Sequence, residues 1–182
     1  MKHKILIVVD MQFDFVDGTL GSEEAKVAAV KIEEKIKSLD DSTFIIFTRD
    51  THYDNYMETL EGKKLPIPHC IFETEGWNVI DTLIKAAKGK EIHFLNKKTF
   101  GATGLHNCIF NYCIQKQINI EDLEVEFCGV CTDICVVSNA LLLRANFPNM
   151  DISLHKDLCA GTDPDHHEAA LKVMEACQID II

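Results

Sequence analysis

The 182-residue sequence lacks any apolar run approaching the ~20 residues that a membrane-spanning helix needs. The apolar segment nearest the start, residues 5–9, ends at Asp10. It is therefore typical of a buried strand rather than of a signal peptide. No other targeting segment is evident, so we expect a cytoplasmic protein with no membrane partner.

Positive charge is also scarce. Lysine and arginine total 18 residues against 29 aspartates and glutamates, which gives a formal net charge of −11. Nucleic acids and acidic membranes require a basic face on their protein partner. The composition therefore argues against both and is compatible with a small-molecule substrate.

The chain has eight cysteines but no Cys-x-x-Cys pair. Cys131 and Cys135 are four positions apart, and Cys108 and Cys113 are five apart, and neither spacing is common in zinc or thioredoxin-like sites. In a cytoplasmic protein these residues are expected to be thiols. With only 4 prolines and 9 glycines, and no linker or repeat, residues 1–182 are expected to form a single domain.

Apolar, β-prone segments alternate with helical patterns along the chain. The expected strands are residues 4–9, 43–48, 92–95, 123–130, 151–154 and 179–182, and the expected helices are 23–39, 77–87, 105–115, 134–145 and 164–177. This order predicts a three-layer α/β/α fold with a mainly parallel, Rossmann-like sheet of about six strands. Residues 53–75 have no clear period and are expected to form a long functional loop.

The segment around Cys135 is the main candidate for chemistry. A β-prone run stops at Gly129, and a helical pattern begins at Thr132 or Asp133, both helix-capping residues. Cys135 therefore falls near the first turn, where unpaired N–H groups and the helix dipole favour a thiolate. The alternative is a small buried apolar side chain.

Polar groups follow several expected strands: Asp10, Asp50 with His52, Lys98, and Cys135. In parallel sheets, sites form at the carboxyl ends of the strands. Asp10 could act as base for the thiol, and Lys98 could hold Asp10 ionised or stabilise a thiolate. The backbone N–H groups of Cys131 and Cys135 are candidate oxyanion donors. Alternatively, Lys98 is an exposed charge.

Asp50, His52 and His69 supply one carboxylate and two imidazoles. Such a set suits zinc or a first-row transition metal with open water positions. Spacing alone is a weak signal, because His69 lies far along the loop. His166 and His167 fall in the first turn of the last expected helix, where a structural role is the simpler interpretation.

Together these motifs resemble the isochorismatase-like cysteine hydrolases over nearly the whole chain. The matching segments are residues 8–15, Lys98 to Ala102, 129–136, 157–161 and 167–171. The resemblance implies an Asp10–Lys98–Cys135 triad and a thioester intermediate. It also implies a cis peptide bond between Val130 and Cys131, which aims the Cys131 N–H into the oxyanion hole.

The nicotinamidase-like branch of that family carries metal ligands, and residues 48–52 with 65–76 are similar to its metal segments. The resemblance implies Asp50, His52 and His69 as ligands of a divalent ion, most simply Zn²⁺, with Mn²⁺ or Fe²⁺ as alternatives. Phe15, Val130 and Cys131 are expected to contact the substrate. A further histidine frequent in that loop is replaced here by Asn55 or Tyr56.

The leading prediction is thus an amidohydrolase that converts nicotinamide to nicotinate and ammonia, and the resemblance implies a homo-oligomer. A second hypothesis is another hydrolase of the family, acting on a different amide, a carbamoyl compound or an isochorismate-like vinyl ether. A third is a non-catalytic or redox protein that uses the thiols of Cys131 and Cys135.

Overall fold

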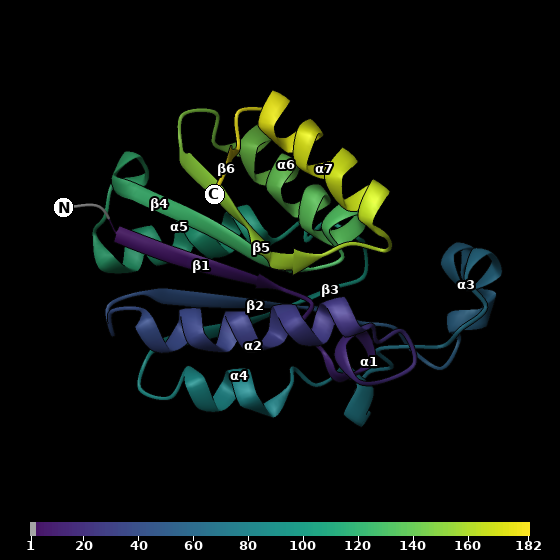
Figure 1. Cartoon of the computed structure of the whole chain (residues 1–182). Helices are drawn as coiled ribbons and strands as arrows, with labels where there is room; N and C mark the ends of the chain where they lie inside the picture. The colour runs from purple at the N-terminus through teal and green to yellow at the C-terminus, as the bar shows by residue number, and fades with distance from the viewer. Residues whose placement is uncertain (1–2) are drawn as a thin grey trace.

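The computed structural model describes residues 3–182, so positions 1 and 2 of the expected domain lie outside it. The described residues form a six-stranded sheet in the order β3-β2-β1-β4-β5-β6, with every neighbouring pair parallel (Figure 1). The strands are β1 (His3–Val9), β2 (Phe44–Asp50), β3 (Glu91–Lys97), β4 (Leu123–Val130), β5 (Asp151–Ala160) and β6 (Asp180–Ile181). This confirms the expected fold class.

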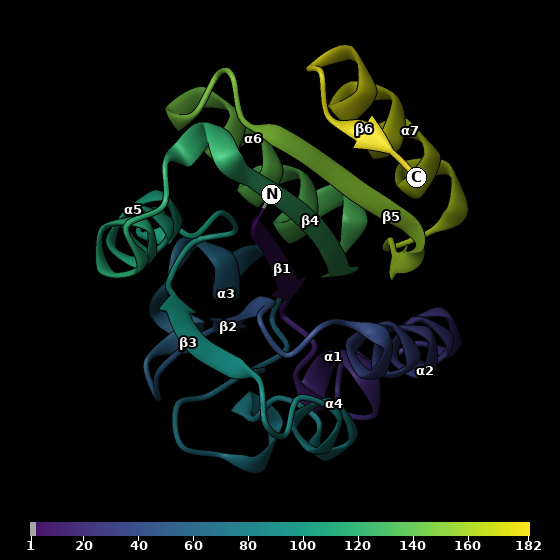
Figure 2. The same cartoon turned by 90° about the vertical axis from the view of Figure 1, so that its left-hand side faces the viewer.

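Helices cover both faces of the sheet (Figure 2). One face packs against α5, α6 and α7, and the other against α2 and α4, with a separate apolar core on each side. The helix bounds are α1 (Phe13–Val16), α2 (Glu23–Ser38), α3 (Leu60–Lys64), α4 (Asp81–Ala86), α5 (Leu105–Lys116), α6 (Val137–Asn146) and α7 (Pro164–Ala176); short 3₁₀ turns are η1 (Tyr56–Glu58), η2 (Glu75–Trp77) and η3 (Ile120–Asp122).

Local sequence explains these elements. Residues 5–9 of β1 are at most 1% exposed, because both faces of the strand lie under helices, and this is why the run is continuously apolar. The Ser22 side chain caps α2 by accepting the Ala25 N–H, and Asp163 caps α7 by accepting the His166 N–H. Pro164 occupies the first turn of α7, where it costs no hydrogen bond.

Strands β3 and β5 extend beyond the apolar segments from which they were predicted. β3 continues to Lys97, two residues beyond the expected end, and β5 continues to Ala160. The segment 53–75 is not structureless, since it contains η1 and α3 and leads into η2. We call residues 53–75 the arm, and its helix α3 stands out beyond the carboxyl end of the sheet (Figure 1).

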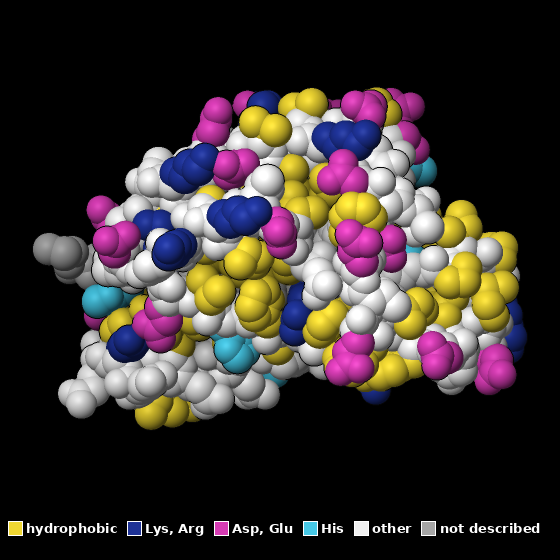
Figure 3. Space-filling view, turned by 90° about the horizontal axis from the view of Figure 1, so that it is seen from below, with side chains coloured by type: hydrophobic (Ala, Val, Ile, Leu, Met, Phe, Trp, Pro, Cys, Tyr) yellow, Lys and Arg dark blue, Asp and Glu magenta, His cyan; other side chains and the backbone are white. Residues whose placement is uncertain are grey.

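On the face that carries α2 and α4, acidic and basic side chains are interspersed, and apolar side chains gather toward the end where the arm lies (Figure 3). Exposed apolar residues of the arm include Met57, Leu60 and Ile67. Among the described residues, no helix combines the length and apolarity required to cross a bilayer.

Candidate active site

Asp10 terminates β1 in a conformation that fixes its carboxylate. Its φ of +50° lies in the left-handed region, which costs a non-glycine residue about 1 kcal/mol. The Thr48 hydroxyl on β2 donates to Asp10 Oδ1 at 2.6 Å and also accepts the Asp10 N–H at 3.2 Å. Asp10 is fully buried. A carboxylate that is buried and hydrogen-bonded in this way is held at one position.

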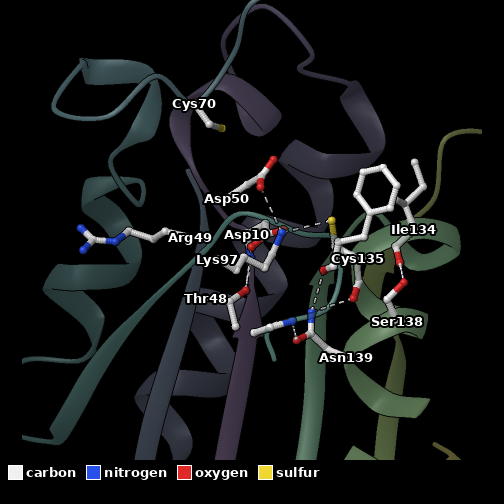
Figure 4. Close-up of polar contacts among 12 residues, drawn as sticks. Asp10, Thr48, Arg49, Asp50, Cys70, Lys97, Ile134, Cys135, Ser138 and Asn139 are labelled. Carbon is white, nitrogen blue, oxygen red and sulfur yellow. Dashed lines mark hydrogen bonds and ion pairs between the residues drawn. The ribbon is translucent and has the colours of Figure 1, made fainter. Parts of the chain in front are cut away.

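The cation beside Asp10 is Lys97, so the expectation that Lys98 occupies this place is wrong. Lys97 Nζ lies 2.7 Å from Asp10 Oδ2 and 3.5 Å from Cys135 Sγ (Figure 4). Lys97 is the last residue of β3, and its backbone pairs with Asp50 of β2. Successive side chains of a strand point to opposite sides, so only one of two adjacent lysines can reach the site.

Lys98 points elsewhere. Its ammonium lies 4.7 Å from the centre of the Tyr53 ring in the arm, and the residue is exposed. The tandem lysines gave no local signal that could separate the two roles. The position where β3 ends separates them, because extending the expected strand to residue 97 pairs Lys97 with Asp50 of β2.

Cys135 lies in a π-helical turn, η4 (Thr132–Val136), between β4 and α6. Gly129 precedes the turn with φ +120°, and a Cβ there would lie 2.1 Å from the Val9 carbonyl oxygen, so the site requires glycine. The Val130–Cys131 peptide bond is cis, as expected from the sequence. Cys135 is 5% exposed and its sulfur contacts the Lys97 ammonium, so it is not simply a small buried apolar side chain.

Side-chain hydrogen bonds reinforce the junction between the π turn and α6. The Ser138 hydroxyl donates to the Ile134 carbonyl at 2.6 Å, and the Asn139 amide donates to the Cys135 carbonyl at 2.8 Å (Figure 4). Asn139 also accepts the Ala102 N–H at 2.8 Å, which ties the loop after β3 to the turn. Asn139 was missed from the sequence, because its partners are known only in three dimensions.

The electrostatics favour a resting thiol and an available base. Burial raises the pKa of the Cys135 thiol well above its ordinary value, and the nearby Asp10 carboxylate adds to this. Burial also raises the pKa of Asp10, opposed by the charge on Lys97. Burial alone would lower the pKa of Lys97, but Asp10, Cys135 and Asp50 together outweigh it and the pKa is raised. A thiol in this state needs a base, and Asp10 is the carboxylate in place.

A cluster of possible metal ligands adjoins these residues. One donor atom from each of Asp50, His52, Glu61 and His69 lies within 4.8 Å of the other three. Asp50 Oδ2 is 2.9 Å from His52 Nε2 and 3.6 Å from His69 Nε2. Glu61 Oε1, from α3, is 3.6 Å from His52 Nε2 and 3.7 Å from His69 Nε2.

Glu61 was missed from the sequence, where a carboxylate in an aperiodic loop carries no signal. The nearby Tyr56 does not offer a donor to this cluster. Its ring packs edge-on against the rings of His52 and His69, with centroids 4.7 and 5.1 Å apart. The arm therefore contributes two of the four candidate ligands, Glu61 and His69, and an aromatic wall.

The donor set fits a divalent ion. The carbonyl of Ile67 lies 2.8 Å from His69 Nδ1, which leaves Nε2 facing the cluster, as in most metal-binding histidines. Burial would raise the pKa of Asp50, but hydrogen bonds from His52 and His69 and the charge on Lys97 outweigh it, so the pKa is lowered. Two imidazoles and two carboxylates match the ligand preferences of zinc.

Two polar residues of the first-strand motif, the buried Gln12 and the half-buried Asp14, hold this cluster in place. The Gln12 amide accepts the Asp50 N–H at 2.7 Å and donates to the Asp50 carbonyl at 2.9 Å. Asp14 accepts the N–H of Cys70, the neighbour of His69, at 2.7 Å. The motif after β1 thus fixes Asp50 at the end of β2 and the segment of the arm that carries His69.

A cavity of about 900 Å³ opens beside Cys135 and the metal-ligand cluster. Its walls come from the α1–α2 region, the arm, the loop after β3 and the β5–α7 loop. The remaining wall is the turn that carries the candidate nucleophile Cys135, η4 with the preceding residues 130 and 131, which we call the nucleophile turn. Phe15, Val130 and Cys131 line it, which places them where a substrate contact was expected. Their contact with a substrate stays a prediction.

The comparisons with known proteins agree with this geometry. The isochorismatase domain family matches residues 4–182. The chain belongs to the isochorismatase family. An uncharacterized isochorismatase family protein of Bacillus subtilis, PncA, is 28% identical over 179 residues, which cover 92% of each chain.

Solved structures of family members have the same fold. The nicotinamidase PncA from Bacillus subtilis superposes with a TM-score of 0.79 at 26% identity, covering 100% of this chain and 99% of that one. A pyrazinamidase of Pyrococcus horikoshii in complex with zinc gives a TM-score of 0.77 at 26% identity, covering 99% and 98%. The family and these neighbours support an amidohydrolase, which confirms the enzyme class expected from the sequence.

Proposed function

We propose that this isochorismatase-family hydrolase cleaves a small amide, with nicotinamide as the first candidate, through a thioester on Cys135. The observation that carries the proposal is the position of Lys97 Nζ, 2.7 Å from Asp10 and 3.5 Å from Cys135, next to the Asp50–His52–Glu61–His69 cluster. The similarity of the fold to a nicotinamidase and to a pyrazinamidase supports the choice of substrate.

The residues of the chain account for each proton. Asp10 interacts with the Cys135 thiol and takes its proton while the sulfur attacks the amide carbon. The N–H groups of Cys131 and Cys135 are the proposed donors to the oxyanion. Asp10 then returns the proton to the nitrogen, the C–N bond breaks and ammonia leaves. Water releases the carboxylate from the thioester, with Asp10 again as base.

Lys97 supplies the positive charge in this scheme. Its ammonium keeps Asp10 ionised before proton transfer and offsets negative charge on the sulfur during attack. Asp50, His52, Glu61 and His69 would hold a divalent ion, most simply Zn²⁺, which when bound acts as a Lewis acid toward the ring nitrogen of nicotinamide and water.

Ammonia release from nicotinamide tests the proposal. We expect zinc-loaded wild-type protein to release ammonia and nicotinate in equal amounts, and Cys135→Ala to be inactive. Acid quenching of the wild type during turnover should trap an acyl group on Cys135, visible by mass spectrometry. A wild-type protein with stoichiometric zinc and no turnover of nicotinamide would refute this substrate, and turnover by Cys135→Ala would refute the thioester.

The size of the cavity supports a second candidate, a hydrolase of the same family that acts on a larger amide or carbamoyl compound. A volume of about 900 Å³ is near the upper end of the ~300–1,000 Å³ typical of small-molecule pockets, well above the need of a one-ring amide. A panel of amides of increasing acyl size separates the two. A kcat/KM that rises with acyl size would favour the second candidate.

A further inference from the structure

The C-terminal segment makes specific contacts with the nucleophile turn that the proposed reaction does not use. A hydrogen bond of 2.9 Å joins Thr132 Oγ1 in η4 to His167 Nδ1 in α7. Thr132 is fully buried, and His167 is half-buried. Thr132 directly follows Cys131 and lies three residues before Cys135, so this bond fixes the turn between the two proposed oxyanion donors.

A second contact holds the same turn from the β5–α7 loop. The Asp133 carboxylate accepts the Thr162 N–H at 2.8 Å through Oδ1 and the Thr162 hydroxyl at 2.5 Å through Oδ2. Both carboxylate oxygens of Asp133 are therefore bonded to one residue. Consecutive residues of η4, Thr132 and Asp133, are thus each anchored to the C-terminal segment.

Gly161 permits this close approach. A Cβ at Gly161 would lie 2.8 Å from the Cβ of His167 and 3.0 Å from Asp133 Oδ1. Those distances are shorter than ordinary contacts, so a larger residue would push the loop away from the turn. Gly161 and His167 both belong to the C-terminal sequence pattern and both lie against the nucleophile turn, which gives that pattern a physical role.

We propose that Thr132–His167 and Asp133–Thr162, which we call the turn clamp, are positioning residues that hold the oxyanion donors of the nucleophile turn. The inference rests on the proposed acyl transfer at Cys135. The clamp holds the backbone of the turn and leaves the Cys135 side chain free, because its bonds are made by the side chains of residues 132 and 133.

The clamp therefore predicts different effects on two reactions of Cys135, acylation and alkylation. Acylation passes through an oxyanion and depends on where the backbone N–H groups point. Alkylation by iodoacetamide displaces iodide from a saturated carbon, forms no oxyanion, and depends on access and on deprotonation of the thiol. Loosening the clamp should therefore slow acylation and leave alkylation unchanged.

The experiment uses p-nitrophenyl acetate as an activated acyl donor, with the burst of p-nitrophenol as the acylation rate and Cys135→Ala as the blank. Thr132→Val removes the hydroxyl at nearly constant shape, and Thr132→Ser keeps it. Thr162→Val removes the hydroxyl bond of the second contact, at an exposed position, and keeps the bond from the Thr162 N–H to Asp133. Glu168→Ala, an exposed neighbour of His167 on α7, is the matched control. Nicotinamide turnover and iodoacetamide alkylation are measured on each protein.

We expect Thr132→Val to acylate about 10–100-fold more slowly than wild type, as for a displacement on the order of 1 Å, and Thr162→Val, which keeps one of its two bonds, to be slowed by a smaller factor. Alkylation should stay within about twofold, the loss should fall on kcat rather than KM, and Thr132→Ser and Glu168→Ala should behave as wild type. Equal acylation by Thr132→Val and wild type, or a parallel fall in alkylation, would overturn the clamp.

The outcome is separable from that of the proposed function. Wild-type protein that acylates with the ester but does not hydrolyse nicotinamide would refute the substrate and leave the clamp supported if the variants still acylate slowly. Wild-type protein that shows no burst above the Cys135→Ala blank and does not hydrolyse nicotinamide would refute both.

Discussion

Replacement of Lys97 by methionine is the perturbation with the largest expected effect. The Lys97 side chain is 1% exposed, and its ammonium is 2.7 Å from Asp10 and 3.4 Å from Asp50. Methionine has a similar length but no charge. It would leave Asp10, which is fully buried, without a cation and close to a second carboxylate.

The magnitude follows from that geometry. Two unit charges 2.7 Å apart attract by roughly 6 kcal/mol at an effective dielectric constant of about 20. Desolvation of both ions cancels part of this, and breaking one buried pair typically costs about 3–5 kcal/mol. For a protein of this size that is a fall in Tm of roughly 6–20 °C. Loss of both the ion pair and the charge near Cys135 should lower kcat by about 10²–10⁴-fold.

Lys98→Met is the matched control, because it makes the same chemical change one residue away. Its exposed ammonium rests on the Tyr53 ring, a contact worth about 0.5–1 kcal/mol. We expect Tm close to that of the wild type and an iodoacetamide alkylation rate of Cys135 within about threefold. Thermal unfolding, ammonia release and alkylation are measured on both variants.

The reverse pattern would refute the reasoning. If Lys98→Met were inactive and Lys97→Met retained wild-type activity and stability, the cation of the site would be the one originally expected from the sequence. The ion pair observed between Lys97 and Asp10 would then have no catalytic consequence.

Two further predictions concern the metal cluster and a buried ion-pair cluster. Equilibrium dialysis should show that Glu61→Gln weakens zinc binding by about 10–100-fold and that His69→Ala weakens it more; unchanged affinity in both would remove the metal site. Hydrogen bonds from a histidine and two lysines lower the pKa of Glu126, so its stabilisation is present above the ordinary glutamate pKa and is lost as pH falls below it. Glu126→Gln should therefore cost about 2–3 kcal/mol at pH 7 and less at pH 4, whereas the partly exposed Glu124→Gln should change stability by about 0.5 kcal/mol or less. Urea unfolding at the two pH values decides this, and an equal cost at both would contradict it.

Much of the fold could be predicted because each strand and helix is specified by residues that are neighbours along the chain. The strand and helix order follows from runs that are apolar on both faces and from capping residues such as Ser22 and Asp163. The same patterns placed Asp10 and Cys135 at strand ends, where a parallel sheet brings distant segments together. Asp50, His52 and His69 were found as a ligand set by residue type and by resemblance, and the structure brings them together.

Cellular location and oligomeric state stay predictions, because neither is visible in one chain. The choice between the two adjacent lysines, by contrast, was settled by the structure. It depended on where β3 ends and on which side of the sheet each residue faces, and a two-residue extension of the strand reverses the assignment.

The amino-acid sequence by itself determined the α/β order, and it indicated Cys135 as candidate nucleophile, Asp10 as the carboxylate near it and three of the four clustered metal donors, from short-range patterns, side-chain chemistry and the family resemblance. Only the tertiary structure decided that Lys97 is the cation beside Asp10, that Glu61 joins the donor cluster and that Asn139 and His167 bond to the turn around Cys135. Each of these depends on contacts between residues that are near in space and unrelated in sequence pattern.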